Sequence, residues 1–150
     1  TQVFEHVAIT QIDLPDATKL KYIYDAPDPY PSGTFTVRQN RLIRVDRVDA
    51  ANVVIDSTTY HHENLNFTSY ITGVTDARGV RIGTYAYDER GRGISTEGAG
   101  GNNKYTIVYD DSQAANLAAV PIMKRIVTNP LGKVATAVFA SDVAGHAASA

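Results

Sequence analysis

Four-residue turn signals recur along this chain and constrain its fold more than any other feature. Each begins with Asp or Asn and ends with Gly or a residue that can replace Gly. In such a turn the first side chain accepts a hydrogen bond from the backbone two residues on, and the fourth residue adopts a left-handed conformation. Asp76 to Gly79, Asp88 to Gly91 and Asp142 to Gly145 follow the pattern strictly, and Asn129 to Gly132 adds a proline at its second position. We expect these segments to be tight turns.

The spacing of the turns predicts a meander of antiparallel hairpins. Looser versions of the signal begin at 13, 25, 49, 61, 98 and 110. The first residues pair as 13 with 25, 49 with 61, 76 with 88, 98 with 110 and 129 with 142, at separations of 12, 12, 12, 12 and 13 residues. A four-residue turn and an eight-residue strand fill that interval, because eight residues at about 3.3 Å each make a strand of about 26 Å. Composition agrees, since 15 Val, 11 Ile and 15 Thr against 6 Leu and 4 Glu favour strands over helices.

The runs between paired turns are the expected strands. They cover 17–24, 53–60, 80–87, 102–109 and 133–141, and shorter strands at 9–13, 45–49, 71–76 and 126–129 precede most of them. The longer runs end at or near an aromatic residue, namely Tyr24, Tyr60, Tyr87, Tyr109 and Phe139. Residues two or four apart lie on one face of a strand, so Tyr22, Tyr85 and Tyr105 extend the pattern. We therefore expect a ladder of aromatic side chains on one face of the sheet.

Two strands and two turns make up the bare repeat, and the whole chain, 1–150, is expected to be one segment of about five repeats. The units cover about 5–40, 41–67, 68–91, 92–120 and 121–145. Several prolines mark 26–40 as a surface insertion. An alanine-rich stretch marks 111–120 as a second insertion with a short helix, and 145–150 is expected to be a frayed tail.

The segment from Gly79 to Arg92 carries a more specific pattern. It reads Gly, several residues, Tyr85-Ala86-Tyr87-Asp88, two residues, and Gly91-Arg92. This order resembles the repeat of the RHS, or YD-repeat, family. The Tyr-Asp ending recurs at Tyr24-Asp25 and Tyr109-Asp110, whereas Tyr60-His61 and Phe139-Ala140 keep only the aromatic residue. The residues assigned to the repeat motif are Tyr22, Tyr24, Asp25, Asp76, Gly79, Tyr85, Tyr87, Asp88, Gly91, Arg92, Tyr109, Asp110, Asn129 and Gly132.

The resemblance implies an all-β chain whose hairpins form a curved strip of a β-shell. In longer members of the family, which include bacterial Rhs proteins, insecticidal toxin complexes and teneurins, the strip spirals into a hollow container around a toxic or effector polypeptide. The resemblance also implies a structural, non-enzymatic segment that is secreted or lies on the bacterial cell surface. Its partners would be the remainder of the shell and the enclosed polypeptide, and open sheet edges would allow self-association.

Charge and residue usage argue against several other classes of function. A net charge of −2, with Arg and Lys spread along the chain, gives no electrostatic attraction to nucleic acid. The absence of cysteine excludes thiol catalysis and cysteine zinc sites, and we predict no cofactor and no membrane span. His61-His62-Glu63 could supply metal ligands, but adjacent strand residues point to opposite faces and the segment is expected to be a turn. We therefore predict no metal site and no catalytic residue.

The tyrosine-rich face leaves a second function open. Exposed aromatic rings offer flat apolar surfaces with polar tips on which sugars stack. The alternative is thus a free-standing β-repeat module that acts as a cell-surface adhesin or carbohydrate binder through residues such as Tyr85 and Tyr87. An enzyme is the third alternative. It ranks last because the carboxylates that could act in catalysis are already explained as turn residues.

Overall fold

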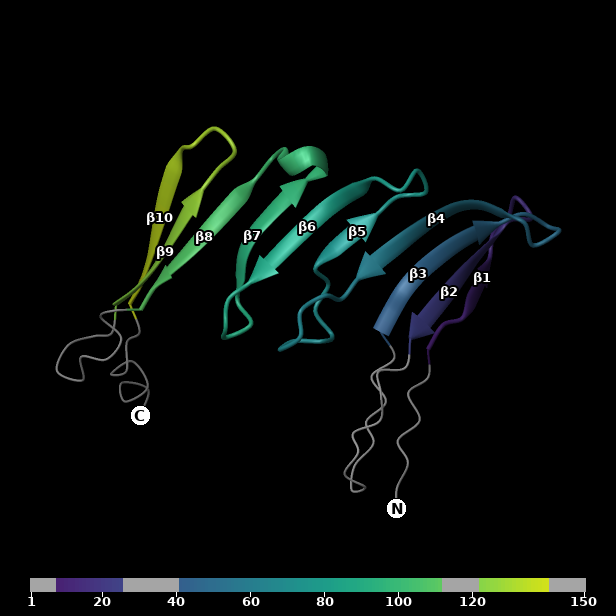
Figure 1. The fold of residues 1–150 in the computed structure, drawn as a ribbon, viewed down its shortest axis with the longest axis horizontal. Coiled ribbons are helices and arrows are strands. Elements are labelled where there is room, and N and C mark those ends of the chain that lie inside the picture. The colour runs from purple at the N-terminus through teal and green to yellow at the C-terminus, as the bar shows by residue number, and fades with distance from the viewer. Residues whose placement is uncertain (1–7, 26–40, 112–121, 141–150) are drawn as a thin grey trace, which may run out of the picture. The chain divides into compact units, whose positions relative to one another are not determined.

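The computed structural model describes residues 8–25, 41–111 and 122–140, and these residues form an all-β fold, as predicted (Figure 1). The strands are β1 (Gln11–Asp13), β2 (Lys19–Asp25), β3 (Arg41–Val48), β4 (Val54–His61), β5 (Gly73–Thr75), β6 (Arg81–Tyr87), β7 (Gly93–Gly98), β8 (Tyr105–Asp110), β9 (Ile122–Thr128) and β10 (Val134–Ala140). A short 3₁₀ turn, η1 (Ala99–Gly101), separates β7 from β8. The ends of the five long predicted runs differ from those of β2, β4, β6, β8 and β10 by no more than three residues. The predicted insertion 26–40, the helix within 111–120 and the tail 145–150 fall outside the described residues, apart from Asp111.

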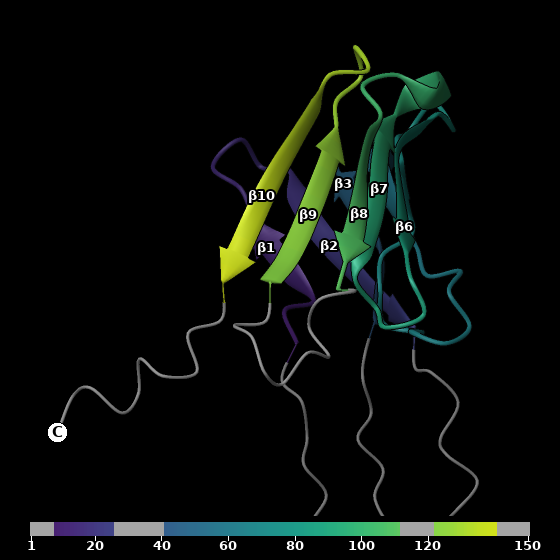
Figure 2. The same cartoon turned by 90° about the vertical axis from the view of Figure 1, so that its left-hand side faces the viewer.

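The strands follow one another in the sheet in the order of the chain. Each pair of neighbours with a resolved register is antiparallel, for example β2 with β3 and β9 with β10. The predicted meander of hairpins is therefore confirmed. The chain divides into two compact units between Thr84 and Tyr85, within β6, so that β1–β5 belong to the first unit and β7–β10 to the second. Figure 2 shows the strands of the second unit side by side.

The turn at residues 88–91 has the predicted chemistry. The Asp88 N–H donates to the Arg92 carbonyl, and the Gly91 N–H donates to the Asp88 carbonyl, both at 2.9 Å. One carboxylate oxygen of Asp88 accepts the N–H groups of Arg90 and Arg92 at 2.9 Å each. Gly91 has φ +75°, a conformation that glycine adopts without the steric cost of a side chain.

Three further turns, 49–52, 76–79 and 129–132, repeat this hydrogen-bond pattern. In each, the side-chain oxygen of the first residue accepts two backbone N–H groups, and the first residues are Asp49, Asp76 and Asn129. The fourth residue again has positive φ, which is +65° at Asn52 and +76° at Gly79. These four turns, which follow β3, β5, β6 and β9, are thus built by the same local interactions.

The predicted turn at 13–16 is displaced by one residue. The Ala17 N–H donates to the Leu14 carbonyl at 3.2 Å, and Ala17 has φ +62°. The Asp16 carboxylate accepts the N–H of Thr18 at 3.1 Å and its hydroxyl at 2.6 Å, so it caps the end of the turn rather than closing it. Asp13 remains in β1, opposite Lys19.

The predicted turn at 61–64 is wrong. His61 is the last residue of β4 and pairs with Gly73 of β5, which draws it into the sheet. A longer connection leads from there to β5, and Asn64 begins a turn within it by accepting the N–H groups of Asn66 and Phe67. Asp25 and Asp110 end β2 and β8, and the remainder of the turns predicted to begin there lies outside the described residues, apart from Asp111.

Few apolar side chains are buried in the described part of the chain. Among the residues whose burial is described, Val48 is the one buried apolar residue, with 2% of its surface exposed. By contrast, the exposed fractions of Val53, Val108, Val134 and Val138 range from 57% to 62%. Globular domains bury the apolar face of a sheet against a second layer. The described residues of each unit leave much of that apolar surface open to solvent.

Candidate functional site

Asp88 and Arg92 flank one turn between β6 and β7. Nε of Arg92 donates to the second carboxylate oxygen of Asp88 at 2.7 Å, while the first oxygen holds the turn backbone. Burial disfavours the ionised form of Asp88, but the hydrogen bonds from Arg92 and Arg90 outweigh it and lower the pKa of this carboxyl. A single carboxylate therefore fixes both the turn and the arginine that follows it.

Asp111 connects the same arginine to the next hairpin. Its carboxylate accepts Nη1 of Arg92 at 2.6 Å, Nη1 of Arg90 at 3.3 Å and Nη1 of Arg125, in β9, at 2.8 Å. The hydrogen bonds from Arg92 and Arg125 lower the pKa of Asp111. We refer to Asp88, Arg90, Arg92, Tyr109, Asp111 and Arg125 as the Arg92 cluster.

Tyr109 forms the apolar centre of the Arg92 cluster. The centroid of its ring lies 4.1 Å from the guanidinium carbon of Arg92 and 4.8 Å from that of Arg125. The Tyr109 hydroxyl donates to the Gly93 carbonyl at 2.9 Å. Guanidinium groups placed over an aromatic ring are attracted to its negative face. The cluster thus joins the segment before β7 to β8 and β9 by charge, hydrogen bonds and ring contacts.

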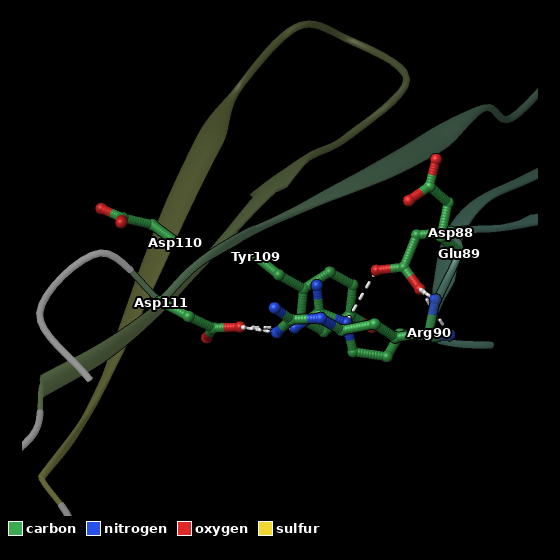
Figure 3. Close-up of a pocket in the computed structure, with 7 residues that line it drawn as sticks. Asp88, Glu89, Arg90, Tyr109, Asp110 and Asp111 are labelled. Atoms are coloured by element: carbon green, nitrogen blue, oxygen red, sulfur yellow. Dashed lines mark hydrogen bonds and ion pairs between the residues drawn. The ribbon is translucent and has the colours of Figure 1, made fainter. Parts of the chain in front are cut away.

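A shallow pocket opens beside the Arg92 cluster (Figure 3). It is lined by Asp88, Glu89, Arg90, Arg92, Tyr109, Asp110 and Asp111. The Asp111 carboxylate accepts hydrogen bonds from Arg90 and Arg92, whereas Figure 3 shows that Asp110 points away from Tyr109. A general acid needs a pKa near the working pH. The lowered pKa values of Asp88 and Asp111 suit charge pairing rather than proton transfer.

A second charged cluster lies in the first unit, around Glu63, Thr72 and Arg81. The two terminal nitrogens of Arg81 donate to the two carboxylate oxygens of Glu63 at 3.0 and 2.8 Å. One of them, Nη2, also donates to the Thr72 carbonyl at 2.8 Å, and the Thr72 hydroxyl donates to Glu63 at 3.0 Å. The hydrogen bonds from Arg81 and Thr72 lower the pKa of Glu63 to about 2. This two-point pairing fixes the β4–β5 connection against β6.

Gly73 makes room for the Arg81 guanidinium. A Cβ atom at this position would lie 2.2 Å from Nη2 of Arg81 and 2.4 Å from its Cζ. No side chain other than the hydrogen of glycine fits there while Arg81 keeps its place. Glycine is therefore required at position 73 because the Arg81 guanidinium approaches its backbone closely, and not because of its backbone conformation.

The His61-His62 pair participates in hydrogen bonds that hold the fold. Nε2 of His61 lies 2.7 Å from the Thr75 hydroxyl, whereas the two ring nitrogens of His62 lie 3.1 and 3.0 Å from the carbonyl oxygens of Tyr70 and Leu42. His62 thereby ties the β4–β5 connection to β3. Within residues 8–25, 41–111 and 122–140, no group of three or more His, Asp or Glu side chains is arranged to hold a metal ion.

The rings of Tyr109 and Phe139 do not stack directly on each other. They lie on β8 and β10, and β9 runs between them, so two strand spacings of about 4.8 Å separate them. Arg125 of β9 fills the gap, with its guanidinium carbon 4.8 Å from the Tyr109 centroid and 6.0 Å from that of Phe139. The expected ladder is here an alternation of aromatic and guanidinium groups.

A small apolar hollow of about 200 Å³ lies on β6, β7 and β8. It is lined by Tyr85, Ala86, Tyr87, Gly93, Ser95, Thr96, Tyr105 and Ile107. Three tyrosines of the predicted aromatic face therefore share one surface depression. Tyr105 is 43% exposed, which leaves its ring accessible to solvent.

The other motif residues serve local structure. Asp25 pairs with Arg41 across β2 and β3, and its carboxylate accepts Nε of Arg41 at 2.9 Å. The Tyr24 hydroxyl donates to the Ile9 carbonyl at 2.9 Å, and Tyr22 lies opposite Val45. The remaining residues lie in the turns described above: Asp76, Gly79, Asn129 and Gly132.

Sequence reasoning missed the residues that pair in the two charged clusters. Asp111, Arg125 and Arg81 carry no local signal, because each meets its partner through strand pairing or across a long connection. The pairing of Tyr109 with Arg125 across β8 and β9 could have been found once the strand register was known.

Comparison with known proteins found neither a matching family model nor a similar curated protein. None of the helical segments in residues 8–25, 41–111 and 122–140 has the length and hydrophobicity of a membrane-spanning helix.

Proposed function

We propose that this chain is a structural, non-enzymatic segment of an RHS-type shell that encloses or displays a toxin or effector polypeptide. The observation that supports it most is the use of the Gly79–Arg92 motif. Asp88 and Gly91 build the turn, and Arg92 ties that turn to Asp111. The motif residues thus hold one hairpin to the next, which is what a repeating wall requires.

The burial pattern supports a wall rather than a self-contained domain. Only Val48 among the described apolar residues is buried, and aliphatic side chains such as Val108 and Val138 are more than half exposed, at 57% and 60%. Sheets with open apolar faces are stabilised by contact with other layers. In the proposed shell, neighbouring repeats and the enclosed polypeptide supply those contacts.

The charge network also fits a repeating wall. Arg92, Asp111 and Arg125 join the segment before β7 to β8 and β9 in a chain of ion pairs of 2.6 and 2.8 Å. Ion pairs within a network, with planar guanidinium geometry, contribute more to rigidity than isolated surface pairs do. A container that must hold its contents benefits from such ties between successive hairpins.

The full-length product of the gene that encodes this chain tests the proposal. Further Tyr-Asp repeats on both sides of these residues, and a separate domain beside them, are expected in its reading frame. In the purified product, that separate domain should resist added protease under native conditions and become sensitive once urea opens the shell. A gene product without additional repeats, or one whose separate domain is digested under native conditions, would contradict the proposal.

Carbohydrate binding is the second candidate, and the hollow around Tyr85, Tyr87 and Tyr105 is the observation that favours it. Titration with a panel of oligosaccharides should then give binding that Tyr85→Ala and Tyr105→Ala abolish. Tyr60→Ala, in β4 of the other unit, is the matched control. If all three variants bind as the native chain does, or if none of the panel binds, this candidate fails.

A further inference from the structure

The β4–β5 connection, residues 62–72, begins with a histidine that lies between two backbone carbonyl groups. Nδ1 of His62 lies 3.1 Å from the Tyr70 carbonyl oxygen, and its Nε2 lies 3.0 Å from the Leu42 carbonyl oxygen in β3. A carbonyl oxygen only accepts hydrogen bonds. A neutral imidazole has one N–H donor and one acceptor nitrogen, whereas the protonated ring donates from both nitrogens. Only the protonated form of His62 therefore makes both hydrogen bonds.

Loss of one proton from His62 turns one of these two contacts from attractive to repulsive. The deprotonated nitrogen then directs its lone pair at a carbonyl oxygen. Leu42 and Tyr70 are both half-buried, so a carbonyl group that loses its donor there also incurs a desolvation cost. One contact closes the connection on itself, and the other ties it to β3. Whichever contact is lost, the connection becomes less firmly held.

Three charged groups surround His62, from β2, β3 and the connection itself: Asp25, Arg41 and Glu63. The hydrogen bond from Arg41 is the main cause that lowers the pKa of Asp25, and the charge of His62 adds a smaller part against the effect of burial. Arg41 also donates to the Thr68 carbonyl at 2.7 Å, and the pKa of Glu63 is about 2. Histidine changes charge between about pH 5 and 8. The three groups keep their charge over that range, and Asp25 favours the protonated His62 ring whereas Arg41 opposes it.

The neighbouring histidine, His61, has a partner that suits either charge state. Its Nε2 lies 2.7 Å from the Thr75 hydroxyl, and a hydroxyl group both donates and accepts hydrogen bonds. A change in the charge of His61 therefore reverses the direction of this hydrogen bond without breaking it. Its Nδ1 lies 3.9 Å from one carboxylate oxygen of Glu63, whose side chain is 57% exposed, so that this ion pair contributes little. Protonation thus has different consequences at two adjacent positions.

We propose that His62 is a pH-sensitive clasp, which closes the β4–β5 connection on β3 when its ring carries two protons and releases one contact when the ring is neutral. Because proton binding favours the closed connection, the closed fraction is highest at acidic pH and falls as the pH rises. The inference does not depend on the shell proposal, since every contact that carries it lies within the first unit.

Amide hydrogen exchange across the range from about pH 5.5 to about 8.5, corrected for the intrinsic rate at each pH, tests the clasp. The N–H groups of Phe67 and Tyr70 report on the connection, because they donate to Asn64 and to the Phe67 carbonyl within it. Their protection should fall about ten-fold or more as the pH rises, which is the effect of losing a hydrogen bond from a charged group. The fall should follow the deprotonation of His62 in nitrogen-15 spectra of its ring. The N–H of Asn52, in the 49–52 turn of the same unit, is the internal control and should keep its protection.

Two glutamine variants assign the pH response to one histidine. His62→Gln keeps a side-chain N–H donor but cannot be protonated, so it should make the protection of Phe67 and Tyr70 independent of pH. His61→Gln is the matched control and should leave the response unchanged, and circular dichroism checks that both variants fold. The pH series on the native chain tests the proposal even if a variant does not fold. Protection that stays constant or rises with pH in the native chain, a response that survives His62→Gln, or one that His61→Gln removes instead would overturn the proposal.

Discussion

Gly73→Ala should destabilise the first unit through an arginine that lies eight residues further along the chain. The new Cβ would lie 2.2 to 2.4 Å from the Arg81 guanidinium, so this side chain must move. Moving it breaks the hydrogen bond to the Thr72 carbonyl and the two-point pairing with Glu63. A hydrogen bond from a charged group contributes about 1.5–3 kcal/mol. The pairing adds about 0.5 kcal/mol, since Glu63 is 57% exposed and solvent screens it.

The replacement of glycine also brings a gain, because alanine lowers the backbone entropy of the unfolded chain by about 0.5–1 kcal/mol. The net loss in free energy of unfolding is therefore about 1–3 kcal/mol. Urea unfolding followed by circular dichroism measures it. Arg81→Ala provides the control, since Gly73→Ala made in that background has nothing left to displace and should be neutral or stabilising. An equal loss in both backgrounds, or no loss in the native one, would refute the steric explanation.

Three other predictions follow from individual contacts. The hydrogen bond from Arg81 lowers the pKa of Glu63 from 4.5 to about 2. The ionised Glu63 carboxylate therefore stabilises the fold above pH 4.5, and this contribution is lost as the pH falls toward 2. Glu63→Gln should reduce the loss of stability over that range, as measured by urea unfolding at several pH values. Ala17 and Gly132 have φ of +62° and +74°, so Ala17→Gly should raise and Gly132→Ala should lower the free energy of unfolding, each by about 1 kcal/mol, and the opposite signs would show that the turns are not as described. Arg125→Met removes the ion pair with Asp111 but keeps the apolar stem of the side chain. Amide hydrogen exchange should therefore accelerate at the end of β8 relative to the control Lys133→Met. Unchanged exchange would show that Arg125 does not stabilise the Arg92 cluster.

The strands and most turns could be predicted because their signals are local. Asp88 and Gly91 lie within one turn, and the hydrogen bonds that they form reach no further than four residues. The 12-residue spacing between paired turns predicts the length of the strands, and strands of that length joined by tight turns predict the meander. The turn at 61–64 failed for a non-local reason, because pairing with Gly73 on β5 keeps His61 in the sheet.

The charged clusters could not be predicted from local pattern. Glu63 and Arg81 are 18 residues apart, and they meet only because β4, β5 and β6 lie next to one another in the sheet. The aromatic ladder was expected from period-two alternation within single strands. That alternation does not reveal that an intervening strand separates Tyr109 from Phe139, or that Arg125 occupies the space between them.

Electron cryo-microscopy of the full-length gene product tests the central claim most directly. If the chain is a segment of a shell, its hairpins should appear within the wall of a closed hollow particle, with separate polypeptide density inside or displayed upon it. A compact particle without an interior, in which these residues pack against a conventional globular core, would contradict the proposal.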